Sequence, residues 1–452
     1  MTPFPIELMH MIVRCLDPAD IANFRLSCWQ FSEIGLEYLF EDAVAYLHHR
    51  SLLRLSELAS HQAASQAVRS LRLDIDGLMD PVLSNEEHVA KAEQSEIRMQ
   101  EINELLIRKN LAKKGLVRPR PKRNLQEEYE VYRATAITQD VILRNKIHHN
   151  VWTFALSKLS NLESISLTSQ ISYHNSPWDA HSLGAHLGEI SDPLGVSDLN
   201  ALLKAVVKSE TRLKELEVGY ISWRFFPQFS VSDLSHVLPS LSHLTTLVLQ
   251  ITTSLGITEV QELREELAGI TEEGGRDEFE FEGLEATECS EAMEDGHLRR
   301  FIKALPNLEK LSVTFDYRDE DGTCGASFDD IFDKNGTWPR FQYLELSTVL
   351  IQSSEFLSFA AKHHHTFREL VLEGITLDSS WITFLTTIQQ TMNLQDADVS
   401  GNLWGQTEPY AEHWQIWPDL RDSLWPELKE FLIEGGTCPL NHENMALGYG
   451  AL

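Results

Sequence analysis

The segment FQYLEL at residues 341–346 is followed, 26 residues further on, by FRELVL at 367–372. After another 27 residues comes LQDADV at 394–399, again with apolar residues at the first, fourth and sixth positions. Side chains two residues apart in an extended chain point to the same face, so each segment predicts a short strand with one buried side. The spacing leaves room for a helix between successive strands.

This six-residue pattern occurs nine times, and its copies begin at residues 68, 162, 213, 244, 308, 341, 367, 394 and 428. Apolar residues at helical spacing lie between some copies, at residues 199–207, 356–361 and 381–389. We therefore predict an α/β fold in which residues 151–435 form an irregular solenoid, because each strand–helix unit buries its apolar face only against its neighbours. An ordinary α/β domain with parallel strands is the alternative.

The copies resemble leucine-rich repeats, although the resemblance is partial. The family's Asn or Cys, three residues after the last apolar position, is present only at Asn402. That side chain normally satisfies backbone groups in the turn that leaves the strand, so its absence elsewhere predicts irregular turns.

Charge and composition exclude several classes of function. The 452 residues include 38 Lys and Arg against 68 Asp and Glu, which gives a net charge of −30. This balance argues against nucleic acid as the main partner, because phosphate neutralisation requires a basic surface. A hydrophobic content of 42% is typical of a globular protein rather than a disordered one.

The cysteines and the apolar runs bear on the cellular compartment. No Cys-x-x-Cys pair occurs, which predicts neither a disulfide framework nor a zinc knuckle. The five cysteines are Cys15, Cys28, Cys289, Cys324 and Cys438. No apolar run reaches the roughly 18 residues of a membrane span, and the N-terminus does not read as a signal peptide. We expect no membrane partner and a cytoplasmic or nuclear location, or both.

Residues 4–40 predict three short helices. The first has two apolar stripes at helical spacing, formed by Leu8, Ile12 and Leu16 and by Met9 and Val13. Asp17-Pro18 is typical of a helix end followed by a capped helix start, and Gly35 loosens the join to the third helix. The second helix has a stripe of Ala22, Leu26 and Trp29 beside one of Ile21, Phe24, Cys28 and Phe31. Three helices of this size cannot enclose all these residues, so the excess must be buried elsewhere.

The run FPIELMHMIVRCLDPADIANFRLSCWQFSEIG at residues 4–35 resembles an F-box. The family pattern is Leu-Pro-x-Glu-Leu, an aliphatic helix, Leu-Asp-Pro-x-Asp-Leu and Leu-x-x-Cys-x-x-Phe, and Phe4 stands where Leu is preferred. The residues that follow, to about residue 76, resemble those of many filamentous-fungal members. The resemblance implies docking on the Skp-family adaptor of a cullin–RING ubiquitin ligase. The implied docking residues are Phe4, Pro5, Ile6, Leu8, Ile12, Leu16, Leu26, Cys28 and Phe31.

The predicted organisation has five parts. Residues 1–45 are the F-box, 46–85 are linking helices with the first repeat-like strand, 86–150 are a polar and basic helical insertion, 151–435 are the repeats, and 436–452 are a C-terminal tail.

Residues 255–295 hold 15 acidic and 2 basic residues and predict a loop, either simply solvated or able to steer a basic partner. Residues 86–114 predict a polar helix. Residues 108–123 hold eight Lys or Arg and no acidic residue. This composition predicts either a solvated linker or a nuclear localisation signal.

Few side chains are spaced as catalysis or metal binding would require. The pairs His48-His49 and His148-His149 lack a partner four residues away, and His363-His364-His365 is typical of a solvated helix end. No metal ligands, cofactor or catalytic residues are therefore predicted. Aromatic residues gather near the C-terminus, at Trp404, Tyr410, Trp414, Trp417 and Trp425. The first four are candidates for binding a target, because Trp and Tyr dominate binding hot spots, but they equally suit a cap on the last repeat.

The expected function is that of a non-catalytic, substrate-recognition subunit of a cullin–RING ubiquitin ligase. The N-terminal helices would bind a Skp-family adaptor, and through it a cullin, while the repeats hold a target protein. The main alternative is a scaffold without ligase function that uses the repeats to assemble partners. A further alternative is an enzyme whose site forms only in three dimensions.

Overall fold

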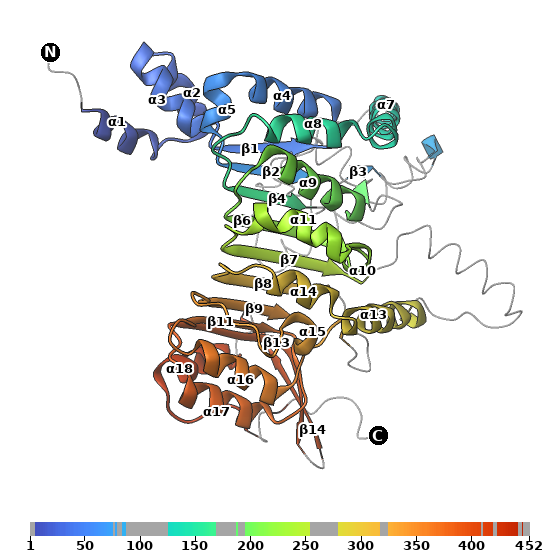
Figure 1. Cartoon of the computed structure of the whole chain (residues 1–452), viewed down its shortest axis with the longest axis vertical. Coiled ribbons are helices and arrows are strands. Elements are labelled where there is room, and N and C mark those ends of the chain that lie inside the picture. The colour runs from blue at the N-terminus through green and yellow to red at the C-terminus, as the bar shows by residue number, and fades with distance from the viewer. Residues whose placement is uncertain are drawn as a thin grey trace, which may run out of the picture.

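The computed structural model describes residues 5–75, 77–78, 84–86, 125–168, 187–188, 195–253, 279–316, 324–407, 410–418, 423–441 and 445. A small helical module at the N-terminus is followed by a mixed α/β body that contains a large, mainly parallel sheet (Figure 1). The basic stretch at 108–123, the first part of the acidic segment and all but the first residue of the predicted polar helix at 86–114 lie outside the described residues.

The described chain begins with α1 (Ile6–Val13), α2 (Pro18–Arg25) and α3 (Trp29–Leu39). The Asp17 carboxylate caps α2 by accepting a hydrogen bond from the Asp20 amide at 2.8 Å. The predicted break at Gly35 is wrong, because α2 and α3 separate at residues 26–28 and Gly35 lies inside α3. A Cβ atom at Gly35 would lie 2.4 Å from Arg25 Cγ, so glycine allows α2 and α3 to pack closely.

The main strands of the sheet follow one another in chain order, each parallel to its neighbours (Figure 1). They are β1 (Asp42–Tyr46), β2 (Ser70–Asp74), β4 (Ser164–Thr168), β6 (Glu215–Ser222), β7 (Thr246–Thr252), β8 (Lys310–Phe315), β9 (Tyr343–Ser347), β11 (Glu369–Glu373) and β13 (Asp396–Thr407). Short strands β10 (Leu350–Ile351) and β12 (Thr376–Leu377) continue the sheet in parallel from β13, and β14 (Tyr410–Ile416) pairs with β13 antiparallel. A separate ladder joins β3 (Gly77–Leu78) to β5 (Leu187–Gly188).

Eight of the nine predicted copies enter this sheet as strands in matching register. Their fourth positions form one row, made of Leu71, Ile165, Leu216, Leu247, Leu311, Leu344, Leu370 and Ala397. Their sixth positions form a second row, made of Leu73, Leu167, Val218, Leu249, Val313, Leu346, Leu372 and Val399. No residue in either row is more than 2% exposed, so the two rows line the main core along the whole sheet.

The strand predicted for the ninth copy is wrong, because residues 428–433 lie in helix α18 (Trp425–Glu434). Leu428 and Phe431 are both buried, one helical turn apart. A spacing of three residues fits a helical turn as well as the start of the strand pattern, and Pro426 stands in the first turn, where proline favours a helix start.

Three predicted domain boundaries differ from the structure. The boundary at residue 45 falls within β1, which pairs with β2 along its whole length. Its inward residues are the small Ala43 and Ala45, so the strand lacks the large apolar side chains of the other copies. The boundary at residue 150 falls within α8 (Ile147–Leu156), whose Trp152 lies in the main core, and so does Leu440 of the predicted tail.

Helices α4, α8, α9, α11, α14, α16 and α17 lie over one face of the sheet (Figure 1). Besides α8 and α18, the body contains α4 (His49–Ser60), α5 (Gln62–Ala67), α7 (Leu125–Arg144), α9 (Val196–Ser209), α10 (Phe225–Gln228), α11 (Val231–Leu241), α13 (Phe279–Glu294), α14 (His297–Lys303), α15 (Phe328–Ile331), α16 (Ser353–His363) and α17 (Trp381–Thr391). The helices predicted at 199–207, 356–361 and 381–389 are confirmed as parts of α9, α16 and α17.

The end of the acidic segment is helix α13 rather than a loop. Its Cys289 and Met293 are fully buried in the main core, so this helix is anchored to the body despite its many carboxylates. In the part of the chain that the structure describes, no helix combines the length and apolar character needed to cross a membrane.

Candidate functional site

The N-terminal module, α1 to α3, has a small core separate from the main core. It consists of Met9, Val13, Ile21 and Ile34, with Leu16, Phe24, Phe31, Tyr38 and Leu39 packed against it. The rings of Phe24 and Phe31 stack with centroids 4.1 Å apart. Helix α3 contacts α5, which places the module at the β1 end of the sheet (Figure 1).

The two apolar stripes of α1 have different environments. Met9 and Val13 face the core of the module, whereas Leu8 and Ile12 are each 43% exposed. Helix α1 therefore presents one apolar side to its own module and another to solvent. Covering the second side with a partner would be favourable by roughly 25 cal/mol for each Å² of apolar surface buried.

Exposed apolar residues concentrate in this module. Six of the sixteen large apolar residues that the described chain exposes lie between residues 6 and 29. We call them the exposed apolar face, and they are Ile6, Leu8, Met11, Ile12, Leu26 and Trp29. Leu26 and Trp29, at the junction of α2 and α3, are 86% and 71% exposed. Single exposed apolar residues are ordinary, whereas six within 24 residues of one small module are a concentration that suits an interaction surface.

The structure exposes six of the nine predicted docking residues, namely Pro5, Ile6, Leu8, Ile12, Leu26 and Cys28. Leu16 and Phe31 are instead half-buried and pack on the core of the module. Phe4 lies outside the described residues. The sequence-based set omitted Met11 and Trp29, although Trp29 shares a predicted stripe with Leu26 and was identifiable from that signal.

The four aromatic residues predicted to bind a target lie on or just after β13 and β14. Trp414 is 1% exposed and lies in the main core, so it cannot contact a target in the folded protein and fits the capping interpretation. Trp417 is 40% exposed, and half-buried Trp404 stacks on His413 with centroids 4.1 Å apart. Tyr410 pairs through its backbone with Thr407.

The first of the three consecutive histidines near the end of α16 is buried, which corrects the predicted solvated helix end. His363 Nδ1–H donates to the Phe359 carbonyl at 2.9 Å, and Nε2 accepts from the Trp338 amide at 3.1 Å. Burial lowers the pKa of His363, which favours the neutral ring that these two bonds require. His364 and His365 are exposed.

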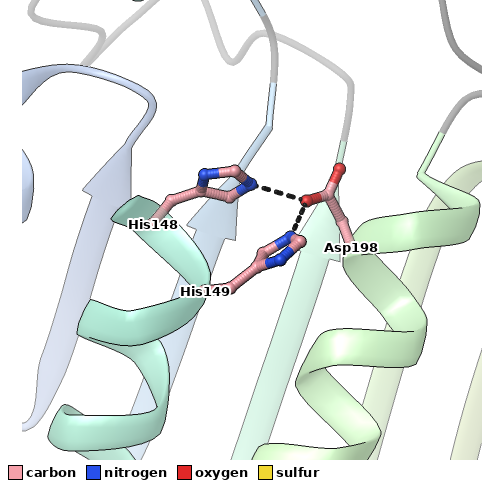
Figure 2. Close-up of side chains that lie close together, drawn as sticks. All are labelled: His148, His149 and Asp198. Atoms are coloured by element: carbon pink, nitrogen blue, oxygen red, sulfur yellow. Dashed lines mark hydrogen bonds and ion pairs between the residues drawn. The ribbon is translucent and has the colours of Figure 1, made fainter. Parts of the chain in front are cut away.

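The second histidine group consists of His148 and His149 together with Asp198, which lies about 50 residues away and was not predicted to join them. His148 and His149, in the first turn of α8, both reach Asp198 in the first turn of α9 (Figure 2). The Nε2 atoms lie 2.9 Å and 2.6 Å from the same oxygen, Asp198 Oδ1. Among the described residues, this is the one group of His, Cys, Asp or Glu side chains placed closely enough to hold a metal ion.

The electrostatics of Asp198 follow from these contacts. Burial by itself raises the pKa of this carboxyl group, but the hydrogen bonds from His148 and His149 outweigh burial and lower the pKa to about 2. Asp198 is therefore ionised at neutral pH.

Comparison with known families matches residues 3–35 to the F-box domain, so the N-terminal module is an F-box. No curated protein matches the chain. The exposed apolar face lies within the matched residues.

Proposed function

We propose that this protein is the substrate-recognition subunit of a Skp–cullin–F-box ubiquitin ligase. The F-box at residues 3–35 supports the first half of this proposal, because F-box domains generally bind a Skp-family adaptor that links them to a cullin. The observation that carries it is the exposed apolar face. Its six side chains lie outside the core of the module, in the residues through which an F-box would meet its adaptor.

The proposed contact has two layers. Ile6, Leu8 and Ile12 of α1, with Leu26 at the α2–α3 junction, would enter the interface directly. Pro5, Cys28 and Phe4 would extend it. Leu16 and Phe31 would act from beneath, by holding the helices in position through the core of the module.

The second half of the proposal concerns the body. We propose that the predicted repeats at 151–435, with β1 and β2 before them, form an irregular leucine-rich-repeat solenoid that holds the target protein, because the described strands pair in parallel and helices cover one face (Figure 1). Exposed Trp417 and half-buried Trp404 support a target contact at the C-terminal end, to which Tyr410 would also belong.

The mechanism in this proposal is proximity. A target bound to the body is held at high effective concentration beside a ubiquitin-loaded enzyme that other subunits supply. No residue of this chain has to form or break a covalent bond. The chain would contribute geometry: a docking module at one end of the sheet and a recognition surface on the body.

A cullin is the partner that separates a ligase subunit from a scaffold. Tagged full-length protein isolated from its own cells should co-purify with both a Skp-family adaptor and a cullin. The Leu8→Asp/Ile12→Asp variant should lose both and keep its target. Recovery of the adaptor without a cullin would support the scaffold alternative, and recovery of a cullin by the variant would contradict docking through the F-box.

The variant must be made by substitution rather than deletion. Removing residues 1–45 would cut away most of β1, whose backbone pairs with β2 from Asp42 to Tyr46. The exposed edge of β2 and the uncovered core would then disturb the body that is meant to serve as the unchanged part.

A further inference from the structure

Helices α8 and α9 pack against each other, and their first turns bring three metal-ligating side chains together (Figure 2). His148 and His149 are neighbours in sequence, while Asp198 lies 50 and 49 residues away from them. One ring nitrogen of each histidine and one Asp198 carboxylate oxygen all lie within 4.8 Å of one another. In the arrangement shown, both imidazoles hydrogen-bond to the same carboxylate oxygen.

We propose that His148, His149 and Asp198 form a binding site for a divalent transition-metal ion of the zinc class, which joins α8 to α9. Zn²⁺ accepts imidazole nitrogens and carboxylate oxygens as ligands, and three protein ligands leave a fourth position for water. The site is independent of the F-box and of the proposed function.

The distances are close to those that such an ion requires. Zn²⁺ holds nitrogen and oxygen ligands at about 2.0–2.2 Å, which places tetrahedral donors about 3.3 Å apart. The two nitrogen–oxygen separations of 2.9 Å and 2.6 Å are therefore too short by less than 1 Å. Coordination requires a small movement of the Asp198 side chain and the transfer of each ring proton from Nε2 to Nδ1 through solvent, because the ion binds the Nε2 lone pair that the proton now occupies.

The surroundings of the three side chains favour binding of a metal ion over contact with water. The side chains of His148, His149 and Asp198 are 3%, 13% and 17% exposed, so the cluster is largely shielded from water. Trp152 packs against both imidazoles, with centroid separations of 5.1 Å and 5.4 Å, and restricts their rotation. The Asp198 carboxyl group supplies the oxygen ligand, and its Oδ1 atom lies between the two imidazoles.

The site has a structural consequence. Helix α8 leads into β4 and α9 leads into β6, so the ion would connect two successive strand–helix units of the sheet. A bound metal stabilises the folded state in proportion to its concentration above its dissociation constant. We therefore expect Zn²⁺ to raise the unfolding temperature of the full-length chain.

Cobalt provides the direct test, because Co²⁺ in a tetrahedral nitrogen and oxygen site absorbs visible light. Metal-stripped full-length protein titrated with Co²⁺ should bind one equivalent with a visible spectrum that Zn²⁺ then abolishes. The Asp198→Asn variant, which keeps the side-chain shape, and the His149→Gln variant, which keeps a polar side chain of similar size, should both bind at least about tenfold more weakly. The matched control is His364→Gln/His365→Gln, which removes exposed neighbouring histidines at the end of α16 and should bind like the unaltered protein.

Two results would overturn the proposal. The absence of a stoichiometric cobalt spectrum in the unaltered protein would do so whether or not the variants fold. Equal binding by the Asp198→Asn variant and the unaltered protein would place the ion elsewhere. Neither result bears on adaptor binding, which is measured without metal, so failure here is distinct from failure of the proposed function.

Discussion

The Leu8→Asp/Ile12→Asp variant should lose binding to a Skp-family adaptor by roughly 1,000-fold while its fold remains intact. Both side chains belong to the exposed apolar face, so aspartate stays hydrated in the free protein. In a complex, two charges would have to enter an apolar interface. Loss of a hot-spot side chain costs roughly 2 kcal/mol or more, and two such losses multiply to about this factor. Titration calorimetry of the full-length variant against the purified adaptor measures the effect.

Two control variants make this result specific. Leu53→Asp/Val231→Asp introduces the same charges at exposed apolar positions of α4 and α11, away from the module, and should bind the adaptor normally. Val13→Asp places a charge in the buried core of the module and should unfold it, with loss of helical circular dichroism. Normal adaptor binding by the Leu8→Asp/Ile12→Asp variant would contradict the assignment of the docking face.

The Trp414→Ala variant should lose about 3–5 kcal/mol of stability, whereas Trp417→Ala should change it by less than about 0.5 kcal/mol. Trp414 is 1% exposed, so truncation leaves a large cavity in the main core. Trp417, three residues further on, is 40% exposed and loses little packing when truncated. Urea unfolding of the two full-length variants, followed by circular dichroism, measures the difference.

This comparison also separates the two interpretations of the C-terminal aromatic residues. A large effect at Trp414 alone assigns it to the cap and leaves Trp417 available for a target. Similar losses of stability in the two variants would show that Trp417 belongs to the cap as well, and the proposed target contact at this end would have to be abandoned.

The strands were predictable because their pattern repeats. A single apolar segment such as FQYLEL is compatible with several structures, but eight copies fit one parallel sheet in one register. The pattern is not visible where the inward side chains are small, and it is misleading where a helix has the same spacing. The inward residues of β1 are alanines, and Leu428 and Phe431 have a spacing that a helix shares.

The F-box could be predicted from the sequence, whereas the group of His148, His149 and Asp198 could not. The F-box was recognisable from local motifs, because it is one continuous segment of about 30 residues that also contains all the predicted docking residues. Which of them are exposed depended on tertiary packing, and Leu16 and Phe31 proved to be half-buried. His148, His149 and Asp198 were not predictable as a group, because the distance between α8 and α9 is set by the sheet beneath them rather than by local spacing.

Amide hydrogen exchange of the full-length protein, with and without excess Skp-family adaptor, tests the central claim most directly. Exchange slows where binding covers or stabilises backbone, so it reports the location of the contact as well as its existence. We predict slower exchange in α1 and at the α2–α3 junction, around Leu8, Ile12 and Leu26, with no change in β6 to β13. Unchanged exchange throughout the F-box in the presence of excess adaptor, or protection confined to the sheet, would contradict the account.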